Sequence, residues 1–243
     1  MLATRFQALL IIIKNVLVTF WISIIIIYKS YRGIYRRDYC DQILRWWARK
    51  ILQFARLSYD LYNPHDVRFE PGRPYILMSN HSSLYDIPLT FAALPGSIRM
   101  LTKKELFQVP IWGKGMAAGE FISIDRDNRR QAFRDLQEAR KKMESGIILW
   151  VAPEGTRSRT GSLGPFKKGG FMLAIQTRAT IIPVGIRGAY DVLPAKTAQF
   201  RTGCHAELHV GRPVETTQYS KKNIGALMEE VEHQIRELAA LPH

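Results

Sequence analysis

The sequence predicts an α/β fold with a mostly parallel central sheet flanked by helices, preceded by an N-terminal membrane-associated two-helix segment. After residue 66, short continuous apolar runs alternate with stretches of helical spacing, which is the pattern of buried parallel strands joined by helices. Before residue 60, a long apolar stretch is followed by an amphipathic one. We therefore expect a membrane-anchoring helical segment over residues 1–60 and one globular domain over residues 61–243.

The first element is an apolar stretch of twenty residues, Leu9 to Tyr28, interrupted only by Lys14, Asn15, Thr19 and Ser23. A helix needs ~20 apolar residues to cross a hydrocarbon layer of ~30 Å. Lys14 leaves two options open, a span with this charge near one interface, or a helix that enters one leaflet. If the helix spans, the Lys and Arg residues that follow it outweigh Arg5 before it and place the rest of the chain in the cytoplasm.

The stretch Asp41 to Tyr59 predicts an amphipathic helix with a basic face. Residues 1–60 hold ten Lys and Arg against three Asp and Glu, within a chain of net charge +14. Such a helix, with Trp46 and Trp47 near its basic face, suits an anionic headgroup layer. The alternative is a helix docked on the globular domain. We favour the membrane, because the preceding segment already brings the chain there.

Five apolar runs predict the strands of the sheet. They are Tyr75–Ser79, Ile98–Lys103, Phe121–Ile124, Ile147–Ala152 and Thr180–Ile186. Two further stretches have the spacing of amphipathic helices, Asn128–Ser145 and Lys221–Leu241. In sheets of this kind, ligand sites gather at the carboxyl ends of the strands, so the residues after each run are the first candidates for a site.

His81 and Asp86 follow the first run, five residues apart. A neutral imidazole can take a proton from a hydroxyl near pH 7, and a carboxylate on its other nitrogen fixes the tautomer and stabilises the imidazolium. Five residues is not a same-face spacing on a helix, so the two meet only if the chain turns between them. The structural alternative is that Asp86 caps a helix that starts before Pro88, and that His81 is an ordinary polar residue at a strand end.

A second polar group follows the run that ends at Ala152. The sequence Pro153-Glu154-Gly155-Thr156-Arg157-Ser158-Arg159 combines a glycine, two hydroxyls and two guanidiniums, which suits a loop that binds an anion. Arg126 lies just past another strand end, and Lys103 and Lys104 lie at a third. Each cation taken alone is more often a solvated loop charge. Several of them on strand ends beside a His/Asp pair indicate a site.

These segments resemble the four ordered blocks of the glycerolipid acyltransferases, most closely the bacterial-size 1-acyl-glycerol-3-phosphate acyltransferases. The matching blocks are Asn80-His81 with Asp86, Phe121-Ile122 through Arg126, Pro153 to Ser158, and Ile182-Pro183-Val184. Lys103-Lys104-Glu105-Leu106 and Phe166-Lys167-Lys168-Gly169 are similar to segments that the family carries between its blocks. The resemblance covers about residues 70–190. One departure is Val151-Ala152 before Pro153, where the family more often has an aromatic residue, and this puts local packing in doubt.

The resemblance implies transfer of a fatty acyl group from a thioester, on coenzyme A or acyl carrier protein, to the sn-2 hydroxyl of lysophosphatidate, giving phosphatidate. No cofactor is implied beyond the acyl-CoA or acyl-ACP co-substrate. The implied partners are the lysophosphatidate in the membrane, the acyl donor and an anionic membrane surface. With the N-terminal segment, this places the acyltransferase domain, residues 61–243, on the cytoplasmic side of the cell membrane.

The resemblance also implies a role for each site residue. His81 is then the general base on the acceptor hydroxyl, and Asp86 orients it. The acceptor phosphate is held by Arg126, Glu154, Gly155, Thr156 and Arg157. Lys103 or Lys104 is a weaker candidate for contact with the phosphate or with the developing oxyanion.

Three other functions are weighed against this one. A sister acyltransferase would act on another acceptor, such as a lyso-ornithine lipid or a lysophospholipid. A serine hydrolase using Ser82 or Ser83 lacks a Gly-x-Ser-x-Gly elbow, and a nucleic-acid-binding protein lacks any motif for that role. A metal site at Cys204, His205 and His209 is also disfavoured, because on a strand the cysteine and the histidines lie on opposite faces.

Overall fold

A single sheet organises the domain. The computed structural model describes residues 1–124 and 129–241. The strands of the sheet lie in the order β1-β7-β6-β2-β5-β3-β4, and the short strand β8 also pairs with β6. The bounds are β1 (Ser58–Tyr62), β2 (Tyr75–Ser79), β3 (Ile98–Lys103), β4 (Ile122–Ile124), β5 (Ile148–Val151), β6 (Thr180–Arg187), β7 (His205–Val210) and β8 (Val214–Glu215). The five strands from β6 to β4 pair in parallel, whereas β7 and β8 run antiparallel to β6. The predicted mostly parallel sheet is confirmed.

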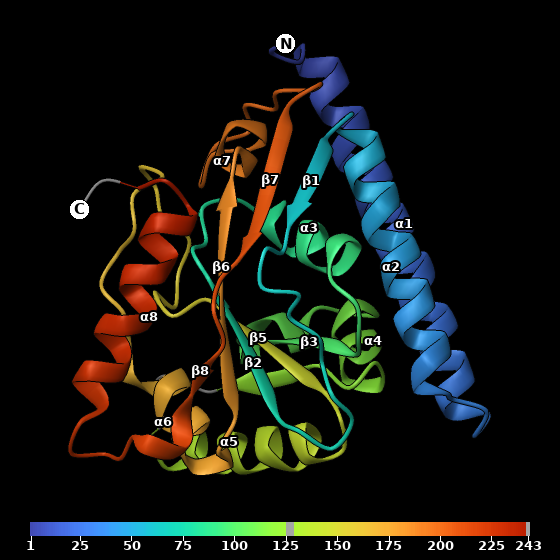
Figure 1. Ribbon diagram of the computed structural model, residues 1–243. Helices are drawn as coiled ribbons and strands as arrows, with labels where there is room; N and C mark the ends of the chain where they lie inside the picture. Colours follow the sequence, from blue (N-terminus) through green and yellow to red (C-terminus); the bar gives the residue numbers. More distant parts are fainter. Residues whose placement is uncertain (125–128, 242–243) are drawn as a thin grey trace.

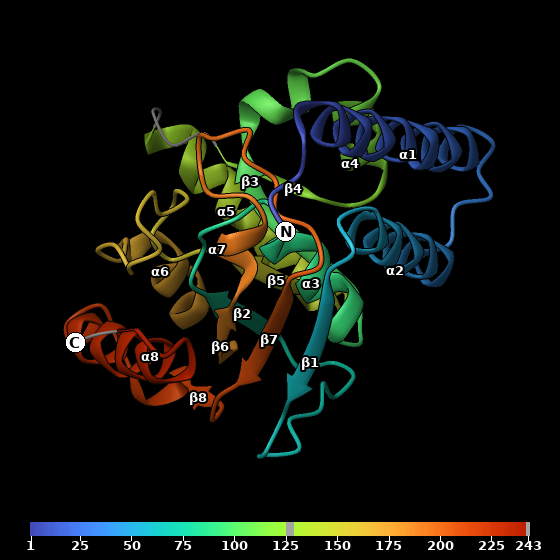
Figure 2. The same cartoon turned by 90° about the horizontal axis from the view of Figure 1, so that it is seen from above.

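Helices cover both faces of the sheet (Figures 1 and 2). Their bounds are α1 (Arg5–Tyr31), α2 (Arg37–Phe54), α3 (Asp86–Ala93), α4 (Trp112–Ala118), α5 (Arg129–Glu144), α6 (Lys168–Thr177), α7 (Ala189–Val192) and α8 (Ile224–Leu238), with short 3₁₀ turns η1 (Lys104–Gln108) and η2 (Thr216–Gln218). One face carries α1 to α4, and the opposite face carries α5, α6 and α8. The hydrophobic core accordingly has two parts, one on each side of the sheet.

Strand β2 shows why its run is apolar throughout. Ile76 and Met78 pack into the core under α5, α6 and α8, whereas Tyr75 and Leu77 pack into the core under α1 to α4. Successive side chains of a strand point to opposite faces, and here both faces are covered. All five residues of β2 are buried, so the run needs an apolar or internally bonded side chain at every position.

The second predicted helix ends earlier than expected. Its pattern predicts a helix to Tyr59, but α2 ends at Phe54, Arg56 takes a left-handed conformation with φ of 52°, and β1 begins at Ser58. The reason is a pairing distant in sequence, since β1 adds to the sheet edge beside β7 with Ser58 opposite His205. Strand formation at the edge therefore overrides the helical pattern of these last residues.

We refer to α1 and α2 as the helix pair. The apolar side of α2 is buried against α3 and α1, with Cys40, Ala48 and Ala55 fully buried. The expectation that this side faces a headgroup layer is therefore wrong, and the alternative of a helix docked on the domain is what the structure shows. Amphipathic spacing reports that one face is buried but does not report what buries it.

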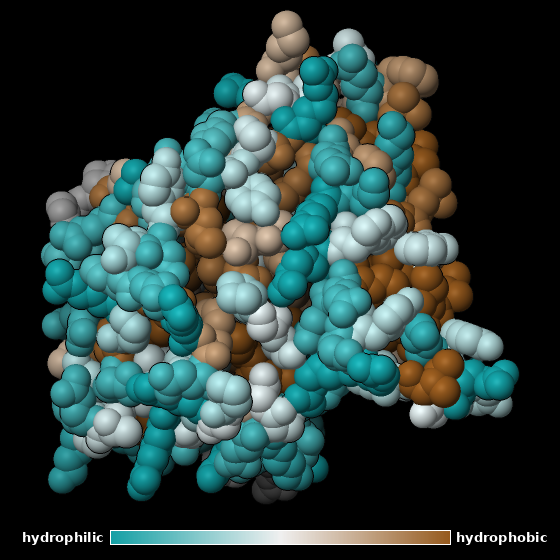
Figure 3. Space-filling model, turned by 45° about the vertical axis from the view of Figure 1, so that its right-hand side comes forward, coloured by the Kyte–Doolittle hydropathy of each residue, from teal (hydrophilic) through white to brown (hydrophobic). Residues whose placement is uncertain are grey.

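Helix α1 is different, because much of its apolar surface is exposed. Among the described residues it is the one helix long and apolar enough to cross a membrane, and 22% of its most apolar stretch is buried inside the protein. Figure 3 shows hydrophobic residues gathered on the side of the molecule that carries the helix pair. The exposed side chains of α1 include Phe6, Leu9, Ile13, Val16, Leu17, Trp21, Ile24 and Tyr28.

Candidate active site

His81 and Asp86 are in direct contact at the carboxyl end of β2. The Nδ1 atom of His81 lies 2.8 Å from the Oδ2 atom of Asp86. The Asp86 side chain is fully buried, and that of His81 is 12% exposed. The chain turns between β2 and α3, and residues 81–86, which we call the His/Asp turn, bring the two side chains together. One imidazole nitrogen is thus bound to a buried carboxylate, which orients the ring.

The Asp86 carboxylate also organises the backbone of this turn. Its Oδ2 atom accepts hydrogen bonds of 2.8 Å from the amides of Ser82 and Ser83. It does not cap its own helix, because the residue before α3 is Tyr85 and no side-chain cap is formed. The carboxylate therefore points back toward His81 and does not cap the helix, whereas the catalytic role of the pair stays a prediction.

The serines of the turn have other partners. The Ser83 hydroxyl is fully buried and donates a hydrogen bond of 3.0 Å to the carbonyl oxygen of Leu193. Ser82 is also buried, at 5% exposure. This geometry gives no support to either hydroxyl as a nucleophile, because Ser83 is bonded away from the imidazole.

Residues 153–158, which we call the Glu154 loop, pack directly against His81. The Glu154 carboxylate accepts the His81 amide at 3.0 Å through Oε1 and the Gly164 amide at 2.8 Å through Oε2. The Ser158 amide donates to the His81 carbonyl oxygen at 2.7 Å. Neighbouring strands β2 and β5 explain this meeting, since both segments leave the same edge of the sheet. Burial raises the pKa of Glu154 above its usual range.

The backbone of the Glu154 loop makes a tight turn at Gly155. Its φ is 73°, and a Cβ atom there would lie 3.0 Å from Cδ of Lys167. Glycine is needed because side chains rarely adopt this conformation and because Lys167 crosses the space beside it. Thr156 is exposed and Arg157 is half-buried. Both residues belong to the loop whose backbone packs against His81, and their role in binding an anion stays a prediction.

The other cations of the predicted site come from other parts of the chain than the His/Asp turn and the Glu154 loop. Lys103 is the last residue of β3 and is exposed, and Lys104 begins η1. They follow the same sheet edge as His81, with β5 between β2 and β3. Arg126 lies outside the described residues. The structure therefore brings together His81, Asp86 and the Glu154 loop, and it places Lys103 and Lys104 after a strand that ends at the same edge of the sheet.

Two residues of this site were missed in the sequence. The Asn80 side chain makes two hydrogen bonds of 2.8 Å to the backbone of Ile186, one to the carbonyl and one from the amide, and so fixes β2 to β6 just before His81. The Trp150 ring meets the His81 ring edge-on with centroids 5.4 Å apart, and its indole N–H donates to Ser79. The sequence signals that could have indicated them are a polar residue at a strand end, for Asn80, and a tryptophan within a buried run, for Trp150.

Comparison with known proteins gives the family. A family model described as Acyltransferase matches residues 61–187, which is more than half of the chain. The chain belongs to the acyltransferase family. The match spans the His/Asp turn and the Glu154 loop, so the contacts between these two segments lie within the part of the chain that matches the family model.

Named relatives of this chain agree with that family. The chain is 32% identical over 166 residues to human 1-acyl-sn-glycerol-3-phosphate acyltransferase alpha, covering 68% of this chain and 58% of that protein. It is 34% identical over 166 residues to the 1-acyl-sn-glycerol-3-phosphate acyltransferase of Saccharomyces cerevisiae, covering 67% and 54%. The chain thus spans less than two thirds of the length of these relatives.

A solved structure shares the fold. The crystal structure of the 1-acyl-sn-glycerophosphate (LPA) acyltransferase PlsC from Thermotoga maritima aligns with a TM-score of 0.72 at 24% sequence identity. The alignment covers 95% of this chain and 97% of that one. The similarity extends through the helix pair as well as the sheet, so this chain shares the whole architecture with that protein.

Proposed function

We propose that this chain transfers a fatty acyl group from an acyl thioester to the sn-2 hydroxyl of 1-acyl-glycerol-3-phosphate, giving phosphatidate for phospholipid biosynthesis. The observation that carries the proposal is the 2.8 Å contact between His81 and the buried Asp86, next to a loop with an arginine and a tight glycine turn. The acyltransferase family and the names of the relatives support the same reaction.

The proposed chemistry needs one base and a short proton path. With Nδ1 bound to Asp86, the Nε2 atom of His81 takes the proton of the acceptor hydroxyl as its oxygen attacks the thioester carbonyl. The C–O bond forms, the C–S bond breaks, and the imidazolium returns the proton to the departing thiolate. A thioester is activated enough for this direct attack. The donor in this proposal is acyl-CoA or acyl-ACP, with no further cofactor.

The acceptor phosphate would lie on the Glu154 loop. Arg157 offers a planar pair of N–H donors that match phosphate oxygens, and the Gly155 backbone lets the phosphate approach closely. Thr156 and Arg126 complete the proposed set, with Lys103 or Lys104 nearby on the same sheet edge. Glu154 repels a phosphate by charge, so we propose that it serves by clamping the loop to His81 through its two backbone contacts.

The exposed apolar side of α1 supports a position at the membrane, where such an acceptor resides. Helix α1 packs lengthwise along α2 and α4, so it could cross the bilayer only by drawing the domain with it. We therefore propose that it lies in one leaflet. We further propose that this is the cytoplasmic leaflet of the cell membrane, where the Lys and Arg residues after α1 would meet anionic headgroups.

The test is an acyl-transfer assay with the purified full chain, labelled acyl donor and lysophosphatidate. His81→Ala is expected to lower the rate by about 10²- to 10⁴-fold, the usual contribution of a general base. Arg157→Ala is expected to raise the acceptor KM by about 10- to 100-fold, the size of a lost charged hydrogen bond. Arg159→Ala is the matched control, because this exposed neighbouring arginine lies outside the proposed site.

Three results would contradict the proposal. A wild-type chain that acylates a lyso-ornithine lipid or another lysolipid in preference to lysophosphatidate would replace the acceptor. Full activity in His81→Ala would remove the proposed base. Loss of acceptor binding in Arg159→Ala equal to that in Arg157→Ala would show that general positive charge, and not the loop geometry, holds the phosphate.

A further inference from the structure

Three polar residues form one stripe along the mostly apolar helix α1. They are Asn15, Thr19 and Ser23, spaced by four residues and therefore on one face of the helix. Each meets a different part of the protein. The Thr19 hydroxyl accepts a hydrogen bond of 2.9 Å from the indole N–H of Trp47 in α2. Ser23 packs against Gly115 of α4, so closely that a Cβ added to Gly115 would lie 2.5 Å from the Cβ of Ser23. This stripe docks α1 on the domain.

Asn15 makes the contact that matters for the site. Its Nδ2 atom donates a hydrogen bond of 3.3 Å to the hydroxyl of Tyr85, the residue directly before Asp86. Its Oδ1 atom is buried and has no hydrogen-bond partner among the described residues. A buried amide in an apolar helix is costly unless it is bonded. The bond to Tyr85 is therefore the contact by which this residue is accommodated.

Tyr85 is enclosed within the His/Asp turn. It is 2% exposed, and its ring meets that of Phe200 edge-on with centroids 6.3 Å apart. Its amide donates to the hydroxyl of Ser83, at 3.3 Å. Burial raises the pKa of Tyr85 to about 12, so its phenol stays protonated in any ordinary assay. The turn is thus fastened from outside at Tyr85, in addition to its internal contacts with Asp86.

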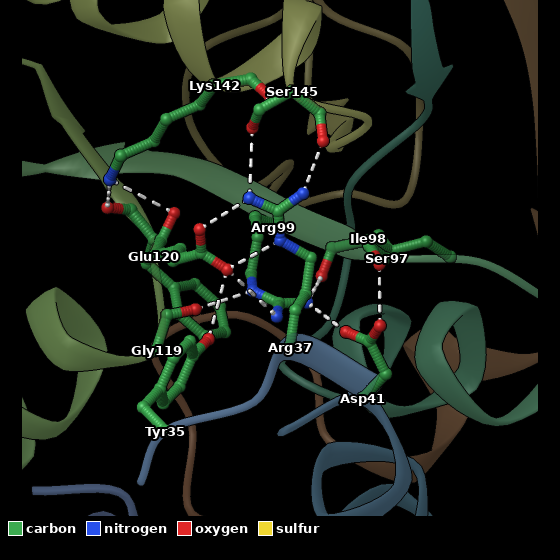
Figure 4. Close-up of polar contacts among 11 residues, drawn as sticks. Tyr35, Arg37, Asp41, Ser97, Ile98, Arg99, Gly119, Glu120, Lys142 and Ser145 are labelled. Carbon is green, nitrogen blue, oxygen red and sulfur yellow. Dashed lines mark hydrogen bonds and ion pairs between the residues drawn. The ribbon is translucent and has the colours of Figure 1, made fainter. Parts of the chain in front are cut away.

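The other end of the helix pair is fixed by a buried cluster of charges (Figure 4). The Arg99 side chain is 1% exposed, and its Nη1 atom lies 2.7 Å from Oδ1 of Asp41 in α2. Arg37, the first residue of α2, donates hydrogen bonds of 2.8 and 2.6 Å to the carboxylate of Glu120. Breaking a buried ion pair is costly, so this cluster holds α2 in one position on the domain.

We infer that Asn15 and Tyr85 are positioning residues for the active site, through which the docked membrane helix α1 holds the His/Asp turn in its reactive geometry. The helix therefore does more than attach the chain to a lipid surface. It supplies a hydrogen bond to the turn that carries His81 and Asp86. The buried charged cluster around Arg99 keeps the helix pair in the position that this hydrogen bond needs. The inference rests on the proposed acyl transfer for its effect on rate.

The experiment compares three conservative variants of the full chain. Tyr85→Phe and Asn15→Leu each remove the hydrogen bond between α1 and the turn and leave the packing largely intact. Thr19→Val is the matched control, since it removes a bond of the same stripe that touches α2 and not the turn. Each is assayed for kcat, acceptor KM and flotation with anionic vesicles. Hydrogen exchange of residues 80–90 follows the turn itself.

We expect Tyr85→Phe and Asn15→Leu to lower kcat by about 3- to 10-fold, the size of one hydrogen bond, with KM and flotation unchanged. The amides of the turn should exchange faster in both variants. Thr19→Val should keep the wild-type kcat and the wild-type exchange of the turn. A merely structural bond would lower thermal stability in all three variants without separating them in kcat.

Two outcomes would overturn the inference. One is wild-type kcat and wild-type exchange in both Tyr85→Phe and Asn15→Leu. The other is an equal loss of kcat in Thr19→Val. If the wild-type chain transfers no acyl group to any lysolipid, the proposed function has failed, and the exchange of residues 80–90 then decides this inference alone.

Discussion

The Oδ2 atom of Asp86 accepts three hydrogen bonds at 2.8 Å, one from Nδ1 of His81 and two from the amides of Ser82 and Ser83. One oxygen thus orients the imidazole and shapes the turn that carries it. Asp86→Asn keeps an oxygen acceptor but loses the charge that stabilises the imidazolium. We expect a fall in kcat of about 10²- to 10⁴-fold with little change in acceptor KM.

Steady-state kinetics check this expectation, with circular dichroism to verify the fold. A variant that keeps its structure and loses only a few-fold in kcat would show that the Asp86 charge is not needed by the base.

Gly155→Ala should weaken the Glu154 loop. A residue with a side chain at φ of 73° costs about 1–2 kcal/mol, and the new Cβ would press on the Lys167 side chain. We expect a lower unfolding free energy and a higher acceptor KM, measured by urea unfolding and by kinetics. Gly169→Ala is the control, because an added Cβ meets nothing there and Ala favours the helix α6. Equal effects at both positions would refute the role assigned to the turn.

Arg99→Met should destabilise the fold more than any exposed arginine variant. The change leaves Asp41 without its closest cation and the carbonyl oxygen of Gly119 without its 2.5 Å donor. Removing one partner of a buried ion pair costs about 3–5 kcal/mol. Arg140→Met breaks an exposed pair with Glu144 and should cost only ~0.5 kcal/mol. Chemical unfolding of the two variants measures the difference, and similar losses would contradict the buried cluster as a clamp.

Glu120→Gln should change the pH dependence of stability. Burial acts to raise the pKa of Glu120, but hydrogen bonds from Arg37 and Tyr35 outweigh it and hold the pKa below the usual range. The folded state therefore favours the ionised form. This contribution is present above the unfolded pKa of about 4.3 and is lost as the pH falls through the folded pKa.

The stability gap between wild type and Glu120→Gln should thus be largest near pH 7 and close toward about pH 3. Urea unfolding across this range measures the gap. A gap independent of pH would show that the carboxylate charge contributes nothing to the attachment of α2.

The sequence predicted the parallel strands β2, β3 and β5 well because most of their residues are buried on both faces. The run Tyr75–Ser79 matches β2 at both ends, and Ile98–Lys103 matches β3. A fully covered strand requires apolar residues at nearly every position, so the ends of the apolar run in the sequence mark the ends of the strand. Strand β1 was missed for the opposite reason. Its residues are mostly exposed, and its pairing partner β7 lies far along the chain.

The placement of the helix pair was only partly accessible. Amphipathic spacing marked the buried side of α2 but not the surface that covers it. The polar stripe of α1 was visible as Asn15, Thr19 and Ser23, and spacing by four residues indicates one docked face. Its partners Tyr85, Trp47 and Gly115 could not be inferred, because they depend on how three other elements meet.

The site was predicted as a set of strand ends, and its contacts came from the topology. Neighbouring β2 and β5 bring the Glu154 loop onto His81, as the rule for parallel sheets implies. The contacts of Glu154 could not be inferred from the sequence, because a carboxylate that accepts hydrogen bonds from two amides looks the same there as one that faces a ligand.

The two sides of α1 have separate roles. The residues at positions 15, 19 and 23 specify where the helix docks, whereas side chains such as Leu9, Leu17 and Ile24 are exposed and shape only its outer surface. Polar replacements on that outer surface should therefore yield a chain that folds normally and remains dispersed without detergent. The same protein could then be handled as a water-soluble body with its helix pair still in place.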